Sequence, residues 1–193
     1  MATDQVAIRS ADELYELLKE SSKVKDYLKW VSVFVSKYGT QTFTLRSPAG
    51  ARLKIGGLKD TDYNDEKLIG WRNFYLPEIV KMEVVGLVEG TSYPCDQLVL
   101  MTCEDRKVYA FDGEEEELHM VAKSLEKLGE KGLKYPSSES YYKGEAFKYM
   151  TEEDWDEVKN SDVGQKLDEE HRKLVEEKKS ELLENLKSAK AVA

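Results

Sequence analysis

The stretch QLVLMTCEDRKVYAFDG, residues 97–113, decides the fold class of this chain. Two short apolar runs, LVLMTC and VYAF, flank the charged turn EDRK. Apolar runs of this length on either side of a short polar turn are typical of a β-hairpin. The stretch therefore predicts two neighbouring antiparallel strands.

Other segments of the chain add strands to this hairpin. IVKMEVVGLVE, residues 79–89, is a third apolar run of strand length. TQTFTLRS (40–47) and ARLKIGG (51–57) alternate apolar and polar residues around the turn SPAG, which predicts a second hairpin. We therefore expect an α+β fold with an antiparallel sheet of five or six strands flanked by helices.

Three helices are expected in the first 132 residues. Ser10 and Glu13 have capping-box spacing before an apolar stripe, which predicts a helix at residues 11–21. The segment 25–38 fits either a helix or a strand, because its apolar residues have helical spacing while VSVFV is dense in β-branched residues; we favour the helix. In DGEEEELHMVAKSLEKLGEKG (112–132), glutamates precede a leucine-rich stripe, and this predicts a helix that ends at Gly129.

The C-terminal third divides into a linker and a helical part. YPSSESYYKGEAFKYMTEEDW (135–155) holds six aromatic residues without helical or strand periodicity, and we interpret it mainly as a strap on the core. Helices are expected at 152–160, capped by Thr151, and at 164–188, where leucines form a narrow stripe. We thus expect an α+β core domain at 1–132, an aromatic-rich strap at 133–151 and an acidic helical extension at 152–193, packed partly against the core.

Charge and composition exclude several functional classes. The chain has a net charge of −9, of which residues 112–193 carry −8, from 14 basic and 22 acidic side chains. Its basic residues are scattered among acidic ones, so the positive patch that nucleic-acid binding needs is missing and we expect no nucleic-acid partner. The sequence has no apolar run long enough to cross a membrane. With no leader-like start and two cysteines, Cys95 and Cys103, read as buried thiols, we expect a cytoplasmic protein.

Motifs of known chemistry are missing. The two histidines, His119 and His171, have no partner at metal-ligand spacing, and we interpret both as structural. The loop that starts at Asp60 resembles a calcium loop but has Asp65 in place of the glycine and Trp71 in place of the last glutamate. We therefore expect no metal site and no cofactor, and we name no catalytic residue.

Two aromatic segments remain as candidate binding sites. Trp71 and Arg72, in GWRNFYLPEIV, form either an exposed binding loop or an anchor for a long connection onto the sheet. In the aromatic-rich stretch, Tyr141 and Tyr142 are adjacent and are not expected to point inward together, so they are candidates along with Trp155.

The span CDQLVLMTCEDRKVYAFDGEEEELHMVAKSLEKLGEKG (95–132) resembles the C-terminal half of the SUKH superfamily, which includes fungal cell-wall-synthesis regulators and bacterial toxin-immunity proteins. The resemblance lies in a strand with Val-Tyr-x-x-Asp, here Val108 to Asp112, and in a following helix with an alanine–serine–leucine core, here Ala122, Ser124 and Leu125. It implies an α+β domain that binds other proteins without catalysis.

We therefore expect a non-catalytic cytoplasmic protein-interaction module, with a protein partner whose surface is basic enough to be attracted to the acidic tail. The alternative is a small-molecule-binding or enzymatic domain, with an aromatic-lined pocket between the sheet and the C-terminal extension. A third expectation is homo-oligomerisation through the leucine stripe of the last helix.

Overall fold

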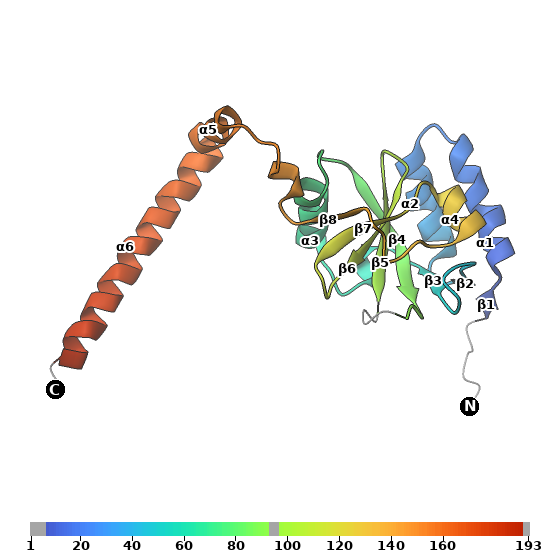
Figure 1. Cartoon of the computed structure of the whole chain (residues 1–193), viewed down its shortest axis with the longest axis horizontal. Coiled ribbons are helices and arrows are strands. Elements are labelled where there is room, and N and C mark those ends of the chain that lie inside the picture. Colours follow the sequence, from blue (N-terminus) through green and yellow to red (C-terminus); the bar gives the residue numbers. More distant parts are fainter. Residues whose placement is uncertain (1–6, 93–96, 191–193) are drawn as a thin grey trace. The chain divides into compact units, whose positions relative to one another are not determined.

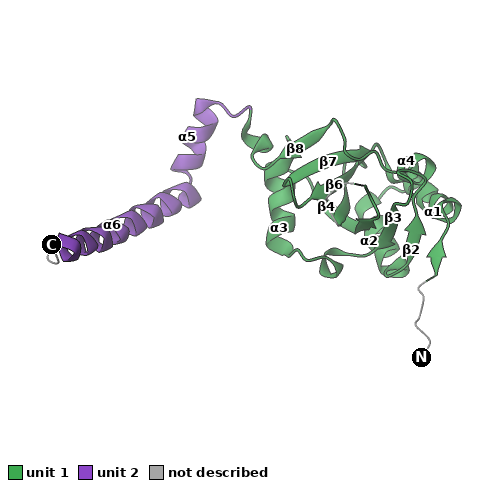
Figure 2. Cartoon of the chain, turned by 60° about the horizontal axis from the view of Figure 1, so that its bottom comes forward, with its two compact units in different colours: residues 1–148 green, residues 149–193 purple. Residues whose placement is uncertain are grey.

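The computed structural model describes residues 7–92 and 97–190 of the chain. It contains two compact units, Met1–Lys148 and Tyr149–Ala193, which are coloured separately in Figure 2. The strap expected at 133–151 therefore belongs almost entirely to the first unit. Each unit is described by itself below.

In the part of the first unit that the structure describes, one mixed sheet has eight strands, in the order β1 to β8 along the sheet. The strands are β1 (Ile8–Arg9), β2 (Thr42–Thr44), β3 (Arg52–Ile55), β4 (Met82–Glu89), β5 (Leu98–Cys103), β6 (Val108–Asp112), β7 (Glu117–Ala122) and β8 (Ser140–Tyr142). The pair β1 and β2 is parallel, and all other neighbours are antiparallel. The expected α+β class with a mostly antiparallel sheet is confirmed, and the sheet has more strands than the five or six expected.

The described residues also form six α-helices and four shorter helical turns. The α-helices are α1 (Ala11–Leu18), α2 (Tyr27–Tyr38), α3 (Asp65–Gly70), α4 (Leu125–Lys131), α5 (Glu152–Asn160) and α6 (Asp162–Lys190). The turns are η1 (Lys19–Lys23), η2 (Leu58–Asp60), η3 (Trp71–Tyr75) and η4 (Glu145–Phe147), of which η3 is π-helical. The helices expected at 11–21, 25–38 and 152–160 are confirmed within a few residues. The side chain of Ser10 accepts a hydrogen bond from the Glu13 amide, as its spacing predicts.

The single helix expected between residues 112 and 129 is wrong. The first three glutamates form a tight turn in which Glu116 has a φ of 54°, and the chain returns along β6 as β7, which begins at Glu117, before α4 begins. The local sequence suits a helix, but pairing with β6 places Leu118 and Val121 in two different parts of the core. Tertiary packing thus overrides local helix propensity, which is worth less than 1 kcal/mol per residue.

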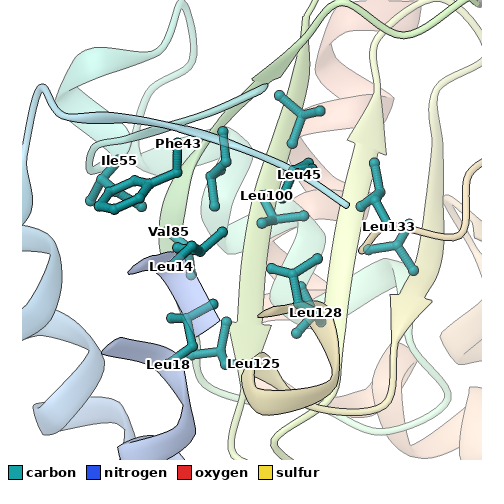
Figure 3. Packing of buried hydrophobic residues seen from close by; sticks show 14 of the residues in the cluster. Leu14, Leu18, Phe43, Leu45, Ile55, Val85, Leu100, Leu125, Leu128 and Leu133 are labelled. Atoms are coloured by element: carbon teal, nitrogen blue, oxygen red, sulfur yellow. The ribbon is translucent and has the colours of Figure 1, made fainter. Parts of the chain in front are cut away.

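One face of the sheet carries α1, α2 and α4 (Figure 1). The main hydrophobic core lies between these helices and the sheet. Figure 3 shows leucines of α1 and α4 meeting side chains of the sheet, including Val85 and Leu100. A spacing of four residues places Leu14 and Leu18 on one side of α1, and both are buried.

The other face is covered by α3, η2 and η3. Trp71, Tyr75 and Phe111 are fully buried there, and the Trp71 and Phe111 ring centroids lie 4.8 Å apart. Strands β5 and β6 lie between the two cores, so all of their residues are buried. Cys103 is one of them, and burial raises the pKa of its thiol. The other cysteine, Cys95, lies outside the described residues.

The second unit consists of α5 and α6. Thr151 and Asp154 form the expected capping box at the start of α5. The break between the two helices falls at Ser161, which ends α5, and Gly164 lies inside α6. Every described residue of α6 except Gly164 is exposed, including its leucines. None of the helices in the described ranges combines the length and the apolar character that a bilayer crossing requires.

Candidate binding face

A cleft of about 490 Å³ lies between β7, α4 and the segment that follows α4. The lining residues are Ser47, Met120, Val121, Ala122, Lys123, Lys127, Lys131, Gly132, Leu133, Lys134, Ser137, Ser138 and Glu139. Lysines and serines thus supply much of its wall. Carbon surface from Met120 and Ala122 supplies another part of it.

The cleft exists because the segment after α4 is fastened to β7 at two points and bows away between them. The Lys134 amide donates to the Val121 carbonyl (3.0 Å), and the Met120 amide donates to the Glu139 carbonyl (2.9 Å). Residues 135–138 span the interval without joining the β7 ladder. Because these residues leave the sheet, the edge of β7 and the end of α4 stay open to solvent.

Gly132 allows the turn that closes this end of the cleft. Its φ is 86°, and a Cβ at this position would lie 2.4 Å from the Ser47 nitrogen. The neighbouring Leu133 amide donates to the Ser47 carbonyl at 2.7 Å. Only glycine suits this backbone conformation and this contact, so the turn depends on it.

The cleft is positively charged although the chain is acidic. Four lysines and one glutamate line it, which gives a local charge of +3. Lys127 pairs with Glu130 at 2.5 Å. For the described residues, the other three lysines (Lys123, Lys131 and Lys134) have no ion-pair partner. The cleft therefore offers three ammonium groups for a negatively charged ligand.

An aromatic edge adjoins the cleft along the sheet, where β8 is the last strand. Tyr142 in β8 is 49% exposed. Phe147 in η4 is also exposed, and its ring centroid lies 5.6 Å from that of Phe74. The Gly144 amide donates to the Phe74 carbonyl at 2.9 Å, which fastens this edge to η3.

The five candidate residues from the sequence fall in different environments. Tyr141 is partly buried and donates to Glu139 at 2.7 Å, and burial raises its pKa to about 12. Tyr142, its neighbour in β8, is exposed, so the two tyrosines do point differently. Trp71 is fully buried, as its role as an anchor predicts, and Arg72 donates to the Val80 carbonyl at 3.3 Å. Trp155 is exposed on α5 in the second unit.

The lysines of the cleft were not singled out from the sequence. Lys123, Lys127, Lys131 and Lys134 follow one another at intervals of four, four and three residues, which is a helical spacing. The signal was hidden because acidic residues lie between them and because only two of the four are in a helix. The structure brings them together around the end of β7.

The comparisons with known proteins identify the family. A family model described as US22-like matches residues 26–140, which is more than half of the chain. The chain belongs to the US22-like family. The match runs from α2 to the start of β8, so it includes most of the sheet, α4 and the cleft of this US22-like domain.

Three viral proteins are similar to this US22-like chain. Protein 005R of Frog virus 3 is 27% identical over 93% of this chain and 87% of its own length. The gene 87 protein of Gallid herpesvirus 2 is 38% identical over 99 residues, which are 48% of this chain and 53% of that protein. Protein FPV250 of Fowlpox virus is 30% identical over 53% of this chain and 70% of its own length. All three are described as uncharacterised.

The coverage of protein 005R is large enough that the similarity must extend into the second unit. No solved structure is significantly similar to the chain. The comparisons thus support the US22-like family and contain no evidence on the SUKH resemblance, which stays a prediction.

Proposed function

We propose that the first unit is a non-catalytic protein-interaction module that binds its partner over the lysine-lined cleft and the aromatic edge beside it. The observation that carries this proposal is the set of three unpaired lysines around one cleft of an acidic chain. Exposed lysines are ordinarily dispersed among acidic neighbours, as they are in α6. Three converging lysines therefore favour binding of a carboxylate or another anion.

The charge of the chain and the charge of the cleft make different demands on the partner. The net charge of the chain predicts a basic partner, because an acidic surface attracts one over long distances. Inside the cleft the local charge is opposite, so the segment that enters it should be rich in Asp or Glu. Both requirements are met by a partner that carries an acidic segment on an otherwise basic surface.

The aromatic edge gives this face apolar contact area. Tyr142 and Phe147 are exposed next to the sheet edge, and exposed aromatic side chains are enriched in protein interfaces. Binding without catalysis is also what the SUKH resemblance implies, and a SUKH-like interaction domain is the finer assignment that we propose. We place its action in the cytoplasm, on the basis of the sequence.

A small anionic molecule is the second candidate ligand. The volume of the cleft, about 490 Å³, lies within the range of small-molecule sites. This cleft is not the aromatic-lined pocket expected between the sheet and the C-terminal extension, because its walls are mainly lysine, serine and aliphatic carbon. An anion would therefore be bound through charge and hydroxyl groups.

The proposal is tested by measuring fluorescence anisotropy of labelled poly-Glu and poly-Lys peptides with the full chain and two charge variants. The cleft variant carries Lys123→Glu, Lys131→Glu and Lys134→Glu. The control variant carries Lys25→Glu, Lys29→Glu and Lys59→Glu, which are exposed lysines away from the cleft. Both variants change the net charge by the same amount.

We expect poly-Glu to bind the wild-type chain and the cleft variant to bind it at least about tenfold more weakly, since two or three charge contacts are reversed. The control variant should differ from wild type by less than about threefold. An equal loss in both variants would show that only the overall charge matters and would reject the cleft. A rise in melting temperature with phosphates or dicarboxylates, lost in the cleft variant, would favour the small-molecule candidate.

A further inference from the structure

Three potential metal ligands converge at the hairpin between β6 and β7. Asp112 ends β6, Glu115 lies in the turn and His119 lies in β7. Each offers one ligand atom, and these atoms lie within 4.8 Å of one another. In the ladder, Asp112 pairs with Glu117 and Ala110 pairs with His119, so Asp112 and His119 are diagonal neighbours on one face of the sheet.

Two of the three ligands are withdrawn from water. Asp112 and His119 are each only 3% exposed, whereas Glu115 is exposed. A carboxylate and an imidazole are seldom buried this completely unless their polar atoms are satisfied. Their burial distinguishes this group from the many acidic clusters on the surface of the chain.

The orientation of His119 leaves one ring nitrogen without a partner. Its Nδ1 lies 3.4 Å from the Ser137 carbonyl oxygen, a long hydrogen bond in which Nδ1 is the donor. Its Nε2 is buried and has no hydrogen-bond partner within the described ranges. The nearest acidic oxygen, Oε2 of Glu117, is 3.7 Å from Nε2, which is too far for a hydrogen bond.

This arrangement is the one that metal-binding histidines adopt. Such a histidine typically donates from one ring nitrogen to a carbonyl or carboxylate, so that the lone pair of the other nitrogen faces the ion. In His119 the hydrogen bond to the Ser137 carbonyl keeps the proton on Nδ1, so the lone pair is on Nε2. A cation beside Nε2 would satisfy the one nitrogen that the protein leaves bare.

Asp112 is held equally firmly. Its Oδ1 accepts from the Glu114 amide at 2.8 Å and the Glu115 amide at 3.3 Å, and its Oδ2 accepts from the Tyr135 hydroxyl. These three contacts fix the orientation of the carboxylate. The Tyr135 ring also packs edge-on against His119, with centroids 5.2 Å apart. One tyrosine thus positions both buried ligands.

We propose that Asp112, Glu115 and His119 bind one divalent transition-metal cation, with Zn²⁺ bound more tightly than Mn²⁺. One imidazole nitrogen with two carboxylates suits a first-row transition metal, whereas Mg²⁺ and Ca²⁺ prefer oxygen ligands alone. Ligand atoms around a tetrahedral Zn²⁺ are about 3.4 Å apart, given bonds of about 2.1 Å. The present atoms lie within 4.8 Å of one another, so the ligands must draw closer on binding, and the exposed side chain of Glu115 can move inward.

The bound ion would connect the β6–β7 turn to the segment after α4. His119 touches this segment through Ser137, and Asp112 touches it through Tyr135. The three ligands are not part of the lining of the lysine-lined cleft, although Ser137, whose carbonyl accepts from His119, is.

The test is isothermal titration of the metal-free full chain with ZnCl₂ and MnCl₂, together with NMR of the histidine side chains. The chain has only two histidines, so His171→Gln removes one of two imidazole signals and assigns the other to His119. His171 is exposed on α6 and serves as the matched control. Glu115→Gln is the main test variant, since the Glu115 side chain is exposed and its loss should leave the fold intact.

We expect one Zn²⁺ per chain, a shift of the His119 signal and no shift of His171. Glu115→Gln and His119→Gln should each weaken Zn²⁺ binding at least about tenfold, while His171→Gln leaves it unchanged. A His119 signal that does not respond to 1 mM Zn²⁺ in about tenfold molar excess would overturn the proposal. So would Zn²⁺ binding of equal strength in the wild type and in Glu115→Gln, because the ion would then be bound elsewhere on the surface.

Discussion

The guanidinium of Arg106 lies over the ring of Tyr27, with 4.9 Å between its central carbon and the ring centroid. Arg106 is in the turn between β5 and β6, and it also donates to the carbonyl oxygens of Ser21 (3.0 Å) and Val24 (2.6 Å). One side chain thus connects the central hairpin to the segment between α1 and α2. Its backbone φ of 66° belongs to the turn, in which the Arg106 amide donates to the Cys103 carbonyl at 2.9 Å.

Arg106→Ala should lower the free energy of unfolding by about 2–3 kcal/mol, because it removes one cation–π contact and two charge-assisted hydrogen bonds. Alanine keeps the Cβ, so the cost of the positive φ is the same in both proteins. Urea unfolding followed by circular dichroism measures the change. Lys107→Ala, in the same turn, is the control and should differ from wild type by less than about 0.5 kcal/mol.

The stability of the first unit should fall steeply in strong base. Tyr27 is buried with its hydroxyl 2.6 Å from Oγ1 of Thr102, and burial raises its pKa to about 12. The unfolded chain has a tyrosine pKa near 10, so the stabilising contribution is complete below pH 10 and is lost as the pH rises through 12. A difference of two pKa units between the folded and unfolded chain corresponds to about 2–3 kcal/mol of the free energy of unfolding.

The contribution of Tyr27 can be isolated, although other buried groups act in the same direction. Tyr27→Phe should be about 1 kcal/mol less stable at pH 8, because the hydrogen bond to Thr102 is lost. Between pH 10 and pH 12 the difference between the two proteins should shrink and then reverse. Urea unfolding at a series of pH values measures it, and a difference that stays constant to pH 12 contradicts the assignment.

Gly132→Ala should destabilise the first unit by more than about 2 kcal/mol. The new methyl group would meet the Ser47 backbone at 2.4 Å, in a conformation that only glycine adopts readily. Gly50→Ala is the matched control, since Gly50 has a similar φ of 84° and the nearest atom to its added Cβ is 3.7 Å away. Gly50→Ala should cost about 1–2 kcal/mol. Thermal unfolding compares the two, and equal losses would mean that the Ser47 contact does not matter.

Removing the second unit should leave the first one folded. Both hydrophobic cores are made by residues 14–141, and no described residue of α5 or α6 is buried. A chain ending at Lys148 should have a free energy of unfolding within about 0.5 kcal/mol of that of the full chain. A chain ending at Gly132 loses the buried Leu133 and the partly buried Tyr135 and Tyr141, so it should lose at least about 3 kcal/mol. Similar stability of the two shortened chains would place the domain boundary near residue 132.

Self-association through α6 stays a prediction from the leucine stripe. Leu167, Leu174, Leu182 and Leu186 are all exposed, and an apolar helical stripe of this length gains stability by pairing with a second copy. Leu174→Glu with Leu182→Glu should therefore reduce the mass measured by light scattering to that of a monomer. Lys173→Glu changes the net charge equally and lies on the side of the helix away from the leucine stripe, so it should leave the mass unchanged. A monomeric wild-type chain would reject the prediction.

The strands of the hairpin at residues 97–113 and the helices at either end could be predicted because their signals are local. Capping residues such as Ser10 and Thr151 act over three residues, and a hairpin needs only two neighbouring runs and a turn. The helix or strand ambiguity at 25–38 was resolved in favour of helix α2, whose Val31 and Phe34 are buried. Trp71 could not be assigned from the sequence to the core or to the surface, since its neighbours allow both.

The wrong prediction of a helix at 112–129 also explains why the group of Asp112, Glu115 and His119 was not expected from the sequence. In a helix, Asp112 and His119 would be seven residues and about two turns apart. In the β6–β7 hairpin they are diagonal neighbours, and Glu115 in the turn comes within reach of both. The lysines of the cleft were missed for the same reason, because their grouping depends on where β7 ends and α4 begins.

The sequence alone determined the fold class, the ends of several helices, the acidic C-terminal part and the absence of a recognisable catalytic motif. These features depend on periodicity, caps and composition, which act over a few residues. The tertiary structure decided that residues 117–122 form a strand and that Trp71 is buried. It also brought lysines together around one cleft and Asp112, Glu115 and His119 close to one another. Those outcomes depend on pairing with β6 and on packing against distant residues, and such non-local contacts outweigh local propensity wherever the two disagree.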